Sequence, residues 1–251
     1  MSGSDGAPAA LEFTDLTVRF GGFVAVNSLS LRVPQGQFRA IIGPNGAGKT
    51  TAINAAHGVI RPDGGAIRVS GEDVTRLPTW ARTRRGIART YQITDLFADL
   101  SLRENVELAI HGLAPSRWVA YRRSDRYEDV RERAMYQLDL TGLGGRAEER
   151  VATLSHGEQR QLELIMALAG EPSVLLLDEP AAGLSPAERH SMLTLLETVS
   201  GRMTVVMIEH NFDLVHALAD EVTVLHHGAL VTSAPPAVIQ ADAEVKRIYL
   251  S

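Results

Sequence analysis

The sequence predicts an α/β fold with a mixed β-sheet core and an inserted helical subdomain, and three observations support this. An apolar run at residues 38–42 leads into a glycine-rich loop, and a helical pattern follows at residues 50–57. Charged amphipathic helices then replace strands over residues 93–169. From residue 174 onward, strand-sized apolar runs again alternate with helices. This order is typical of a sheet covered by helices.

The first section contains strand patterns at residues 11–20, 28–33 and 66–69. Gly21 and Gly22 form a turn signal after the first of them. We expect these strands to share one mixed sheet with the strand, loop and helix that begin at residue 38.

The middle section has apolar positions at helical spacing. Residues 102–112, 125–140 and 159–169 predict helices, and Val130, Ala134, Leu138 and Leu140 should face a core. We expect a helical subdomain at about residues 93–169 inside one domain spanning residues 11–251. Residues 1–10, rich in Gly, Ala and Ser, should form a flexible tail.

The last section returns to short apolar runs that suit buried parallel strands. Helical patterns lie between and after them, and a hairpin signal surrounds His227 and Gly228. The expected strands are residues 174–177, 204–208, 222–225 and 229–232, and the expected helices are residues 186–198 and 211–219.

Composition excludes several classes of protein. The chain has 251 residues, a formal net charge of -5 and no cysteine. An acidic chain of this kind is not expected to bind nucleic acid, and without cysteine it has neither disulfides nor thiol chemistry. Its longest apolar runs, such as residues 173–177 and 204–208, fall far short of the ~20 residues of a membrane helix. Any work at a membrane should therefore depend on a partner protein.

The glycine-rich loop at residues 43–50, called the phosphate loop below, fits the pattern of a nucleotide-binding P-loop in full. In such loops the backbone N–H groups and the helix N-terminus face phosphate oxygens. The lysine supplies a charge for the β- and γ-phosphates, and the following hydroxyl binds Mg²⁺. A glycine-rich turn before Lys-Thr is the structural alternative. The loop consists of Gly43, Pro44, Asn45, Gly46, Ala47, Gly48, Lys49 and Thr50.

Two adjacent carboxylates end the apolar strand at residues 174–177. In a parallel sheet, ligands bind at the carboxyl ends of the strands. Asp178 is therefore a candidate for the Mg²⁺ shell, and Glu179 for the base that positions or deprotonates an attacking water. The alternative is that the two acids simply lie in a turn. A phosphate loop upstream in the chain makes this alternative the weaker explanation.

A short segment at residues 154–159, Leu-Ser-His-Gly-Glu-Gln, precedes the next helical pattern. Ser155 with Glu158 three residues later also fits a helix capping box. The segment resembles the signature motif of ABC ATPases, usually Leu-Ser-Gly-Gly-Gln, and stands one helix before the Asp-Glu strand, as in that family. His156 and Glu158 depart from the common form. Ser155 and Gly157, which the resemblance implies for phosphate contact, are retained.

Other landmarks of this family stand in the same order along nearly the whole chain. Gln92 resembles the Q-loop glutamine that senses the metal and faces the membrane subunit. Residues 182–185 resemble the loop that crosses the dimer interface, and His210 resembles the switch histidine that contacts the γ-phosphate. Phe20 takes the place of the aromatic residue that stacks on adenine. The resemblance adds Thr51 and Glu158 to the expected nucleotide contacts.

The resemblance implies an ATPase that binds ATP and Mg²⁺ and closes head to tail with a second ATPase subunit, the same or related. It also implies two permease subunits, a solute-binding protein and a place on the cytoplasmic face of the cell membrane. Residues 89–106 resemble importers of branched-chain amino acids and their urea or short-amide relatives. The rivals are a soluble ABC ATPase, a small-molecule kinase or GTPase, and an inactive scaffold.

Overall fold

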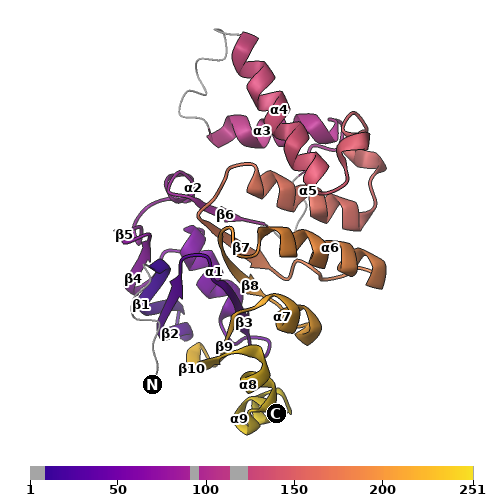
Figure 1. Cartoon of the computed structure of the whole chain (residues 1–251). Helices are drawn as coiled ribbons and strands as arrows, with labels where there is room; N and C mark the ends of the chain where they lie inside the picture. Colours follow the sequence, from indigo (N-terminus) through magenta and orange to yellow (C-terminus); the bar gives the residue numbers. More distant parts are fainter. Residues whose placement is uncertain (1–8, 91–95, 114–123, 251) are drawn as a thin grey trace. The chain divides into compact units, whose positions relative to one another are not determined.

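The computed structural model describes residues 9–90, 96–113 and 124–250. The chain divides into two compact units (Figure 1). The first unit comprises Met1–Arg89, Ser173–Glu179 and Glu197–Ser251, and the second comprises Thr90–Pro172 and Pro180–Leu196. Each unit has a hydrophobic core of its own.

A four-stranded antiparallel sheet occupies the first part of the first unit, in the order β2-β1-β4-β5. Its strands are β1 (Ala9–Phe20), β2 (Phe23–Pro34), β4 (Gly64–Val69) and β5 (Glu72–Asp73). The chain turns through Gly21 and Gly22 so that Phe20 pairs with Phe23. Strand β1 begins at Ala9, two residues before the expected start at residue 11, because Ala9 pairs with Pro34 on β2.

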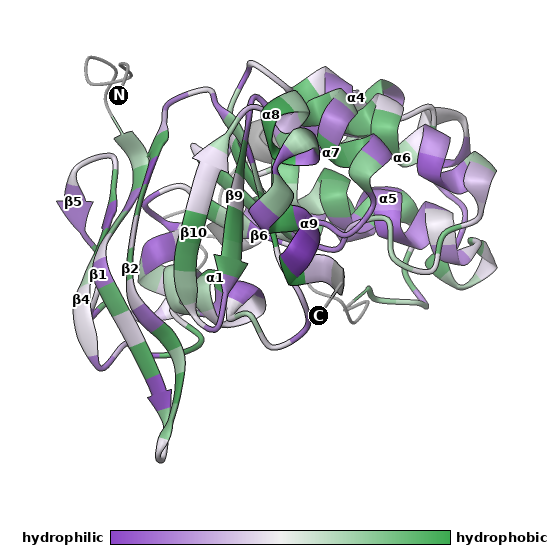
Figure 2. Cartoon of the chain, turned by 90° about the horizontal axis from the view of Figure 1, so that it is seen from below, coloured by the Kyte–Doolittle hydropathy of each residue, from purple (hydrophilic) through white to green (hydrophobic). Residues whose placement is uncertain are grey.

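The second sheet of this unit is mixed, with the order β10-β9-β3-β8-β7-β6. Every neighbouring pair is parallel except β9 with β10. Figure 2 shows β9 mostly in green, whereas β1 and β2 change between green, white and purple. The strands are β3 (Phe38–Ile42), β6 (Ile87–Arg89), β7 (Val174–Asp178), β8 (Thr204–Ile208), β9 (Glu221–His226) and β10 (Ala229–Ala234).

The α/β class and the mixed sheet core are confirmed, but the expected pairing within the first section is wrong. Among the first strands of the chain, β3 joins the mixed sheet, whereas β1, β2 and β4 form the antiparallel sheet. The burial of β3 explains why it joins the mixed sheet, since all five of its residues are buried on both faces of the strand. A strand buried on both faces suits the centre of a parallel sheet. The strand β6 was not expected, because three residues carry too little pattern.

Helices of the first unit pack against these sheets, as the contacts of α1 (Lys49–His57), α2 (Thr79–Thr83) and α8 (Pro236–Ala241) with strands show. Helix α1 contacts β1, β2, β6 and β7 and ends at Gly58, as expected, in a left-handed conformation. The buried guanidinium of Arg82 lies 2.5 Å from the carbonyl oxygen of Ala55 and 2.8 Å from that of Ala56, so it satisfies the last turn of α1. The other helices are α7 (Phe212–Leu218) and α9 (Ala243–Leu250).

The second unit is helical. It contains α3 (Leu102–Leu113), α4 (Ser124–Leu140), α5 (His156–Leu168) and most of α6 (Pro186–Val199), with short 3₁₀ turns at Gly144–Arg146 and Val151–Thr153. Val130, Ala134 and Leu138 are buried as expected, but Leu140 is 42% exposed. It lies two residues after Leu138, which turns it away from the buried face of the helix.

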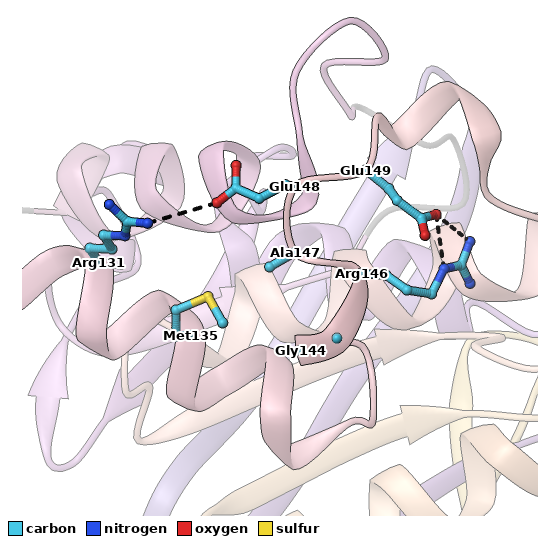
Figure 3. A pocket seen from close by; sticks show the side chains of 8 residues that line it. Arg131, Met135, Gly144, Arg146, Ala147, Glu148 and Glu149 are labelled. Atoms are coloured by element: carbon cyan, nitrogen blue, oxygen red, sulfur yellow. Dashed lines mark hydrogen bonds and ion pairs between the residues drawn. The ribbon is translucent and has the colours of Figure 1, made fainter.

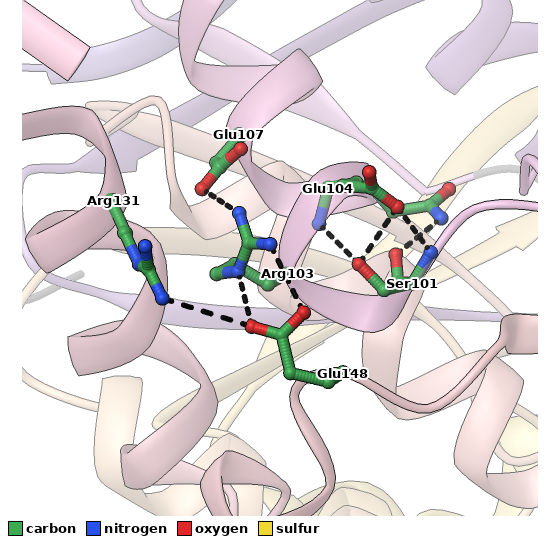
Figure 4. Close-up of polar contacts among 7 residues, drawn as sticks. Ser101, Arg103, Glu104, Glu107, Arg131 and Glu148 are labelled. Atoms are coloured by element: carbon green, nitrogen blue, oxygen red, sulfur yellow. Dashed lines mark hydrogen bonds and ion pairs between the residues drawn. The ribbon is translucent and has the colours of Figure 1, made fainter.

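Ion pairs link α3 to the segment that contains Glu148 in the second unit (Figure 4). Arg103 contacts Glu107 one turn along α3, at 2.5 Å, and also Glu148 at 2.8 Å. At the start of the same helix, the carboxylate of Glu104 accepts hydrogen bonds from the backbone N–H and the hydroxyl of Ser101. These contacts fix the entry of α3, as a capping box does.

Candidate functional site

The phosphate loop connects β3 to α1 and is built closely against its surroundings. Gly48 has φ +94° and precedes the first residue of α1. A Cβ atom on Gly48 would lie 2.4 Å from the carbonyl oxygen of Ala25, and one on Gly43 would lie 2.1 Å from that of Leu225. Only glycine fits both positions. The loop therefore keeps a conformation that leaves the N-terminus of α1 free of a side-chain cap.

Lys49 lies inside this loop with little exposure to solvent. Its Nζ atom donates to the carbonyl oxygens of Gly43, at 2.7 Å, and of Pro44, at 3.0 Å. Burial lowers the pKa of the Lys49 ammonium, while the nearby carboxylates of Glu179 and Asp178 oppose that change. The ammonium is thus held by backbone dipoles at the place where a phosphate would be its stronger partner.

Asp178 is the last residue of β7 and is deeply buried. Its Oδ1 atom lies 3.5 Å from the hydroxyl of Thr50, and its Oδ2 atom lies 3.2 Å from Nη2 of Arg89. Burial raises the pKa of the Asp178 carboxyl, and the Arg89 guanidinium opposes this. Thr50 and Asp178 present two oxygen ligands, which suits Mg²⁺, an ion usually held by one or two protein oxygens plus phosphates and water.

Glu179 follows directly and turns the chain out of the sheet. Its φ of +51° is left-handed, and its N–H donates to the carbonyl oxygen of Ile208 on β8. The turn directs the carboxylate toward His210, whose Nε2 atom lies 2.9 Å from Oε1 of Glu179. Glu179 and His210 are therefore brought together from the ends of β7 and β8.

Glu209 is a further residue at this edge of the sheet that the sequence reading missed. Its side chain is buried, and Oε2 accepts hydrogen bonds from the N–H groups of His210, at 2.7 Å, and Asn211, at 2.9 Å. Asn211 in turn caps α7. Glu209 thus fixes the backbone that carries His210. An acidic residue just before a helix was the available signal.

The remaining candidates of the first unit are placed as follows. Ala47 is buried, Pro44, Gly48 and Thr51 are half-buried, and Asn45, Gly46 and Thr50 are exposed. Phe20 ends β1 with 52% of its surface exposed. Gln92 lies outside the described residues, so its role stays a prediction. Among the described residues there is no cluster of three or more His, Cys, Asp or Glu side chains that could hold a metal by themselves.

The second unit carries the signature segment, defined as residues 154–159. Ser155 caps α5 in a complete capping box, because Glu158 N–H donates to its hydroxyl at 3.3 Å and Ser155 N–H donates to the Glu158 carboxylate at 2.8 Å. The helix begins at His156, three residues earlier than expected. Arg146 also forms an ion pair with Glu158. The Glu158 carboxylate is thus already bound within the unit.

Glu188, on α6, is the second residue that the sequence reading missed. One of its oxygens accepts from the N–H of Gly157, at 3.1 Å, and from the hydroxyl of Ser155, at 3.4 Å. The other accepts from the N–H and the hydroxyl of Ser185. A carboxylate therefore occupies the donor groups that the resemblance implies for phosphate. Glu188 follows Ser185 by three residues, so a capping-box pattern was the available signal.

A pocket of about 430 Å³ opens on the surface of the second unit (Figure 3). Two arginines line it, but Arg131 lies 3.9 Å from Glu148 and Arg146 lies 2.8 Å from Glu149. Their charges are thus compensated by neighbouring carboxylates, and the pocket is a weaker candidate for an anion than the phosphate loop.

Comparisons with known proteins identify the family and the fold. The ABC transporter family matches residues 26–182. The branched-chain amino acid transport ATP-binding protein BraF of Pseudomonas aeruginosa is 37% identical over 249 residues, covering 96% of this chain and 97% of BraF. The solved structure of MJ1267 in its ADP conformation, an ATP-binding cassette of an ABC transporter, superposes with a TM-score of 0.84. It is 26% identical and covers 97% of this chain and 99% of its own.

A second solved structure concerns assembly. It is cbiO1 of Clostridium perfringens, described as part of the ABC transporter complex cbiONQ. It is 25% identical, with a TM-score of 0.80, and covers 97% of this chain and 95% of its own. In the part of the chain that the structure describes, no helix is long and apolar enough to cross a membrane.

Proposed function

Because this chain belongs to the ABC transporter family and is an ATPase of that family, we propose that it powers the import of branched-chain amino acids. ATP hydrolysis as the source of power is supported by the group of side chains at the carboxyl ends of β3, β7 and β8. These side chains come from distant parts of the sequence and lie at one edge of the mixed sheet. They are Lys49, Thr50, Asp178, Glu179 and His210.

Each of these residues has a role in ATP hydrolysis under the proposal. The N–H groups of the phosphate loop and the N-terminus of α1 face the phosphates. The ammonium of Lys49 exchanges the carbonyl oxygens of Gly43 and Pro44 for phosphate oxygens. Thr50 and Asp178 would hold Mg²⁺, which neutralises charge on the phosphates. Glu179 accepts the proton of the attacking water, and His210 orients the Glu179 carboxylate.

We assign Ser155 and Gly157 to the ATP of a second ATPase subunit, the same or related, in a head-to-tail pair. Their donors now bind Glu188, an interaction that a phosphate group could replace. Ser155→Arg tests this, because the added side chain should block closure. ATP affinity of the free chain should match wild type in calorimetry, whereas nucleotide-dependent pairing and turnover should be lost. A Ser155→Arg chain that hydrolyses ATP at the wild-type rate would contradict the assignment.

The proposed assembly adds two permease subunits and a solute-binding protein, with this chain on the cytoplasmic face of the cell membrane. The similar protein cbiO1 is part of an ABC transporter complex, and the described residues provide no spanning helix. Co-expression with permease subunits should therefore move the chain from the supernatant to the membrane pellet. Stable binding to bare lipid vesicles would contradict dependence on a permease.

The solute is assigned from BraF. It is tested by co-purifying the whole assembly from its own membranes and measuring ATP-driven uptake in vesicles. Uptake of leucine, isoleucine or valine is the expected result. Uptake confined to urea or short amides would instead assign the chain to the importers of urea and short amides.

A further inference from the structure

We propose that Arg89 is a positioning residue for the Mg²⁺-binding carboxylate, holding Asp178 so that one carboxylate oxygen faces Thr50. The inference rests on the proposed function, in which Thr50 and Asp178 hold Mg²⁺. The inference adds to the proposed metal site a residue that lies outside both the phosphate loop and the pair Asp178 and Glu179.

The guanidinium of Arg89 is fixed from two sides within the first unit. Nη2 lies 3.2 Å from Oδ2 of Asp178, and Nη1 donates to the amide oxygen of Asn54 on α1. The Arg89 and Asp178 side chains are only 6% and 1% exposed. Arg89 also ends β6 and pairs with Leu176 on β7, so its backbone is fixed in the same sheet as Asp178.

The two oxygens of Asp178 therefore have different partners. Oδ2 is bound to Arg89, whereas Oδ1 lies 3.5 Å from the hydroxyl of Thr50. A carboxylate held through one oxygen cannot rotate freely, and the other oxygen then keeps its direction. Partners of this kind orient metal ligands, and their removal typically weakens metal binding by about 10–100-fold.

Arginine suits this position better than lysine. Its guanidinium is planar and always charged, so it can contact Asn54 and Asp178 at the same time in a fixed geometry. A lysine would retain the charge but offer a flexible point contact. Arg89→Lys and Arg89→Met therefore separate geometry from charge.

A purely structural role for Arg89 makes a different prediction. If the ion pair only joined β6 to β7, its loss would loosen the sheet edge and weaken ATP binding equally with and without Mg²⁺. The useful quantity is therefore the Mg²⁺-linked gain, defined as the ATP affinity with Mg²⁺ divided by the affinity in EDTA.

The experiment measures this gain by calorimetry on the full chain. The variants are Arg89→Met, Arg89→Lys and Asp178→Asn. Arg85→Met is the matched control, because Arg85 lies near Arg89 in sequence but forms an exposed ion pair with Glu72. We expect Arg89→Met to lower the gain by about 10–100-fold with little change in EDTA, and Arg89→Lys to restore part of it. Arg85→Met should match wild type.

Three results would overturn the inference. The first is a wild-type Mg²⁺-linked gain in Arg89→Met together with a lost gain in Asp178→Asn. Asp178 would then belong to the metal site, and Arg89 would have no role in it. The second is an equal loss of affinity with and without Mg²⁺ in both Arg89 variants. The third is a wild-type gain in Asp178→Asn, which removes the proposed metal site and the inference with it. If Arg89→Met fails to fold, Arg89→Lys decides by the same ratio.

Discussion

The two units present their proposed phosphate-binding groups in opposite ways. In the first unit, Lys49 and Asp178 are buried, and backbone carbonyls or Arg89 hold them in place. In the second unit, Ser155 is exposed, and Gly157 and Ser155 are bound to the half-buried carboxylate of Glu188. Buried charges are costly to rearrange, whereas exposed charge contacts contribute little to stability. Under the proposed function, the first unit is thus built for binding and chemistry, and the second for a contact that can be exchanged.

The largest effect expected from this contrast is that of Glu179→Gln in the first unit. Glutamine keeps the shape of the side chain and its reach toward His210, but it cannot accept a proton. Turnover should fall by about 10²–10⁴-fold, while ATP affinity changes little. Steady-state phosphate release is the measurement, with the exposed Glu197→Gln on α6 as control. Wild-type turnover in Glu179→Gln would remove Glu179 from its role as base.

The first unit should also be sensitive to acid, because His57 is buried near two arginines. Burial, with Arg89 and Arg82 nearby, lowers the pKa of His57 to about 4 from 6.5. The unfolded chain therefore takes up a proton between about pH 6.5 and 4 that the folded chain excludes. Stability is full above pH 6.5 and falls as the pH drops toward 4, by about 3 kcal/mol in total.

Urea unfolding followed by circular dichroism at pH 7 and pH 4.5 tests this. His57→Gln should lose less stability between the two pH values than wild type. The control is His216→Gln, since His216 is exposed on α7. Equal losses in wild type and His57→Gln would show that His57 does not carry the effect.

Lys49→Ala should weaken ATP binding by about 10–100-fold, since each hydrogen bond to a charged group contributes roughly 1.5–3 kcal/mol. The other lysine of the chain, Lys246, is exposed on α9 and provides the control Lys246→Ala. Calorimetric titration with ATP is the measurement. An unchanged dissociation constant in Lys49→Ala would refute its contact with phosphate.

The smallest effect is expected in the second unit. Glu188→Ala removes the capping box of α6 and the contacts with Ser155 and Gly157, which should lower the free energy of unfolding only slightly. ATP affinity of the free chain should not change, and the exposed Glu132→Ala on α4 should leave both quantities unchanged. A large loss of ATP affinity in Glu188→Ala would remove the contrast between the two units.

Local patterns in the sequence were enough for the features that depend on neighbouring residues. Three examples are the phosphate loop, the end of α1 at Gly58 and the Ser155–Glu158 capping box, and each of them involves residues that are only a few positions apart. The same reasoning placed Leu140 in the core, where it is not. Leu140 lies two residues after Leu138, so helical spacing turns it away from the buried face, and an apolar side chain alone does not indicate burial.

The sequence by itself determined the order of the motifs, the α/β class and most of the proposed ATP-binding residues. Only the tertiary structure decided that β3 leaves its sequence neighbours for the mixed sheet and that His210 meets Glu179. It also decided that Arg89 holds Asp178, 89 residues further along the chain. Hydrophobic periodicity and capping are local, so a sequence displays them directly. An ion pair between two strands depends on how the sheet is assembled, and a lone arginine at the end of a three-residue strand carries no sign of its partner.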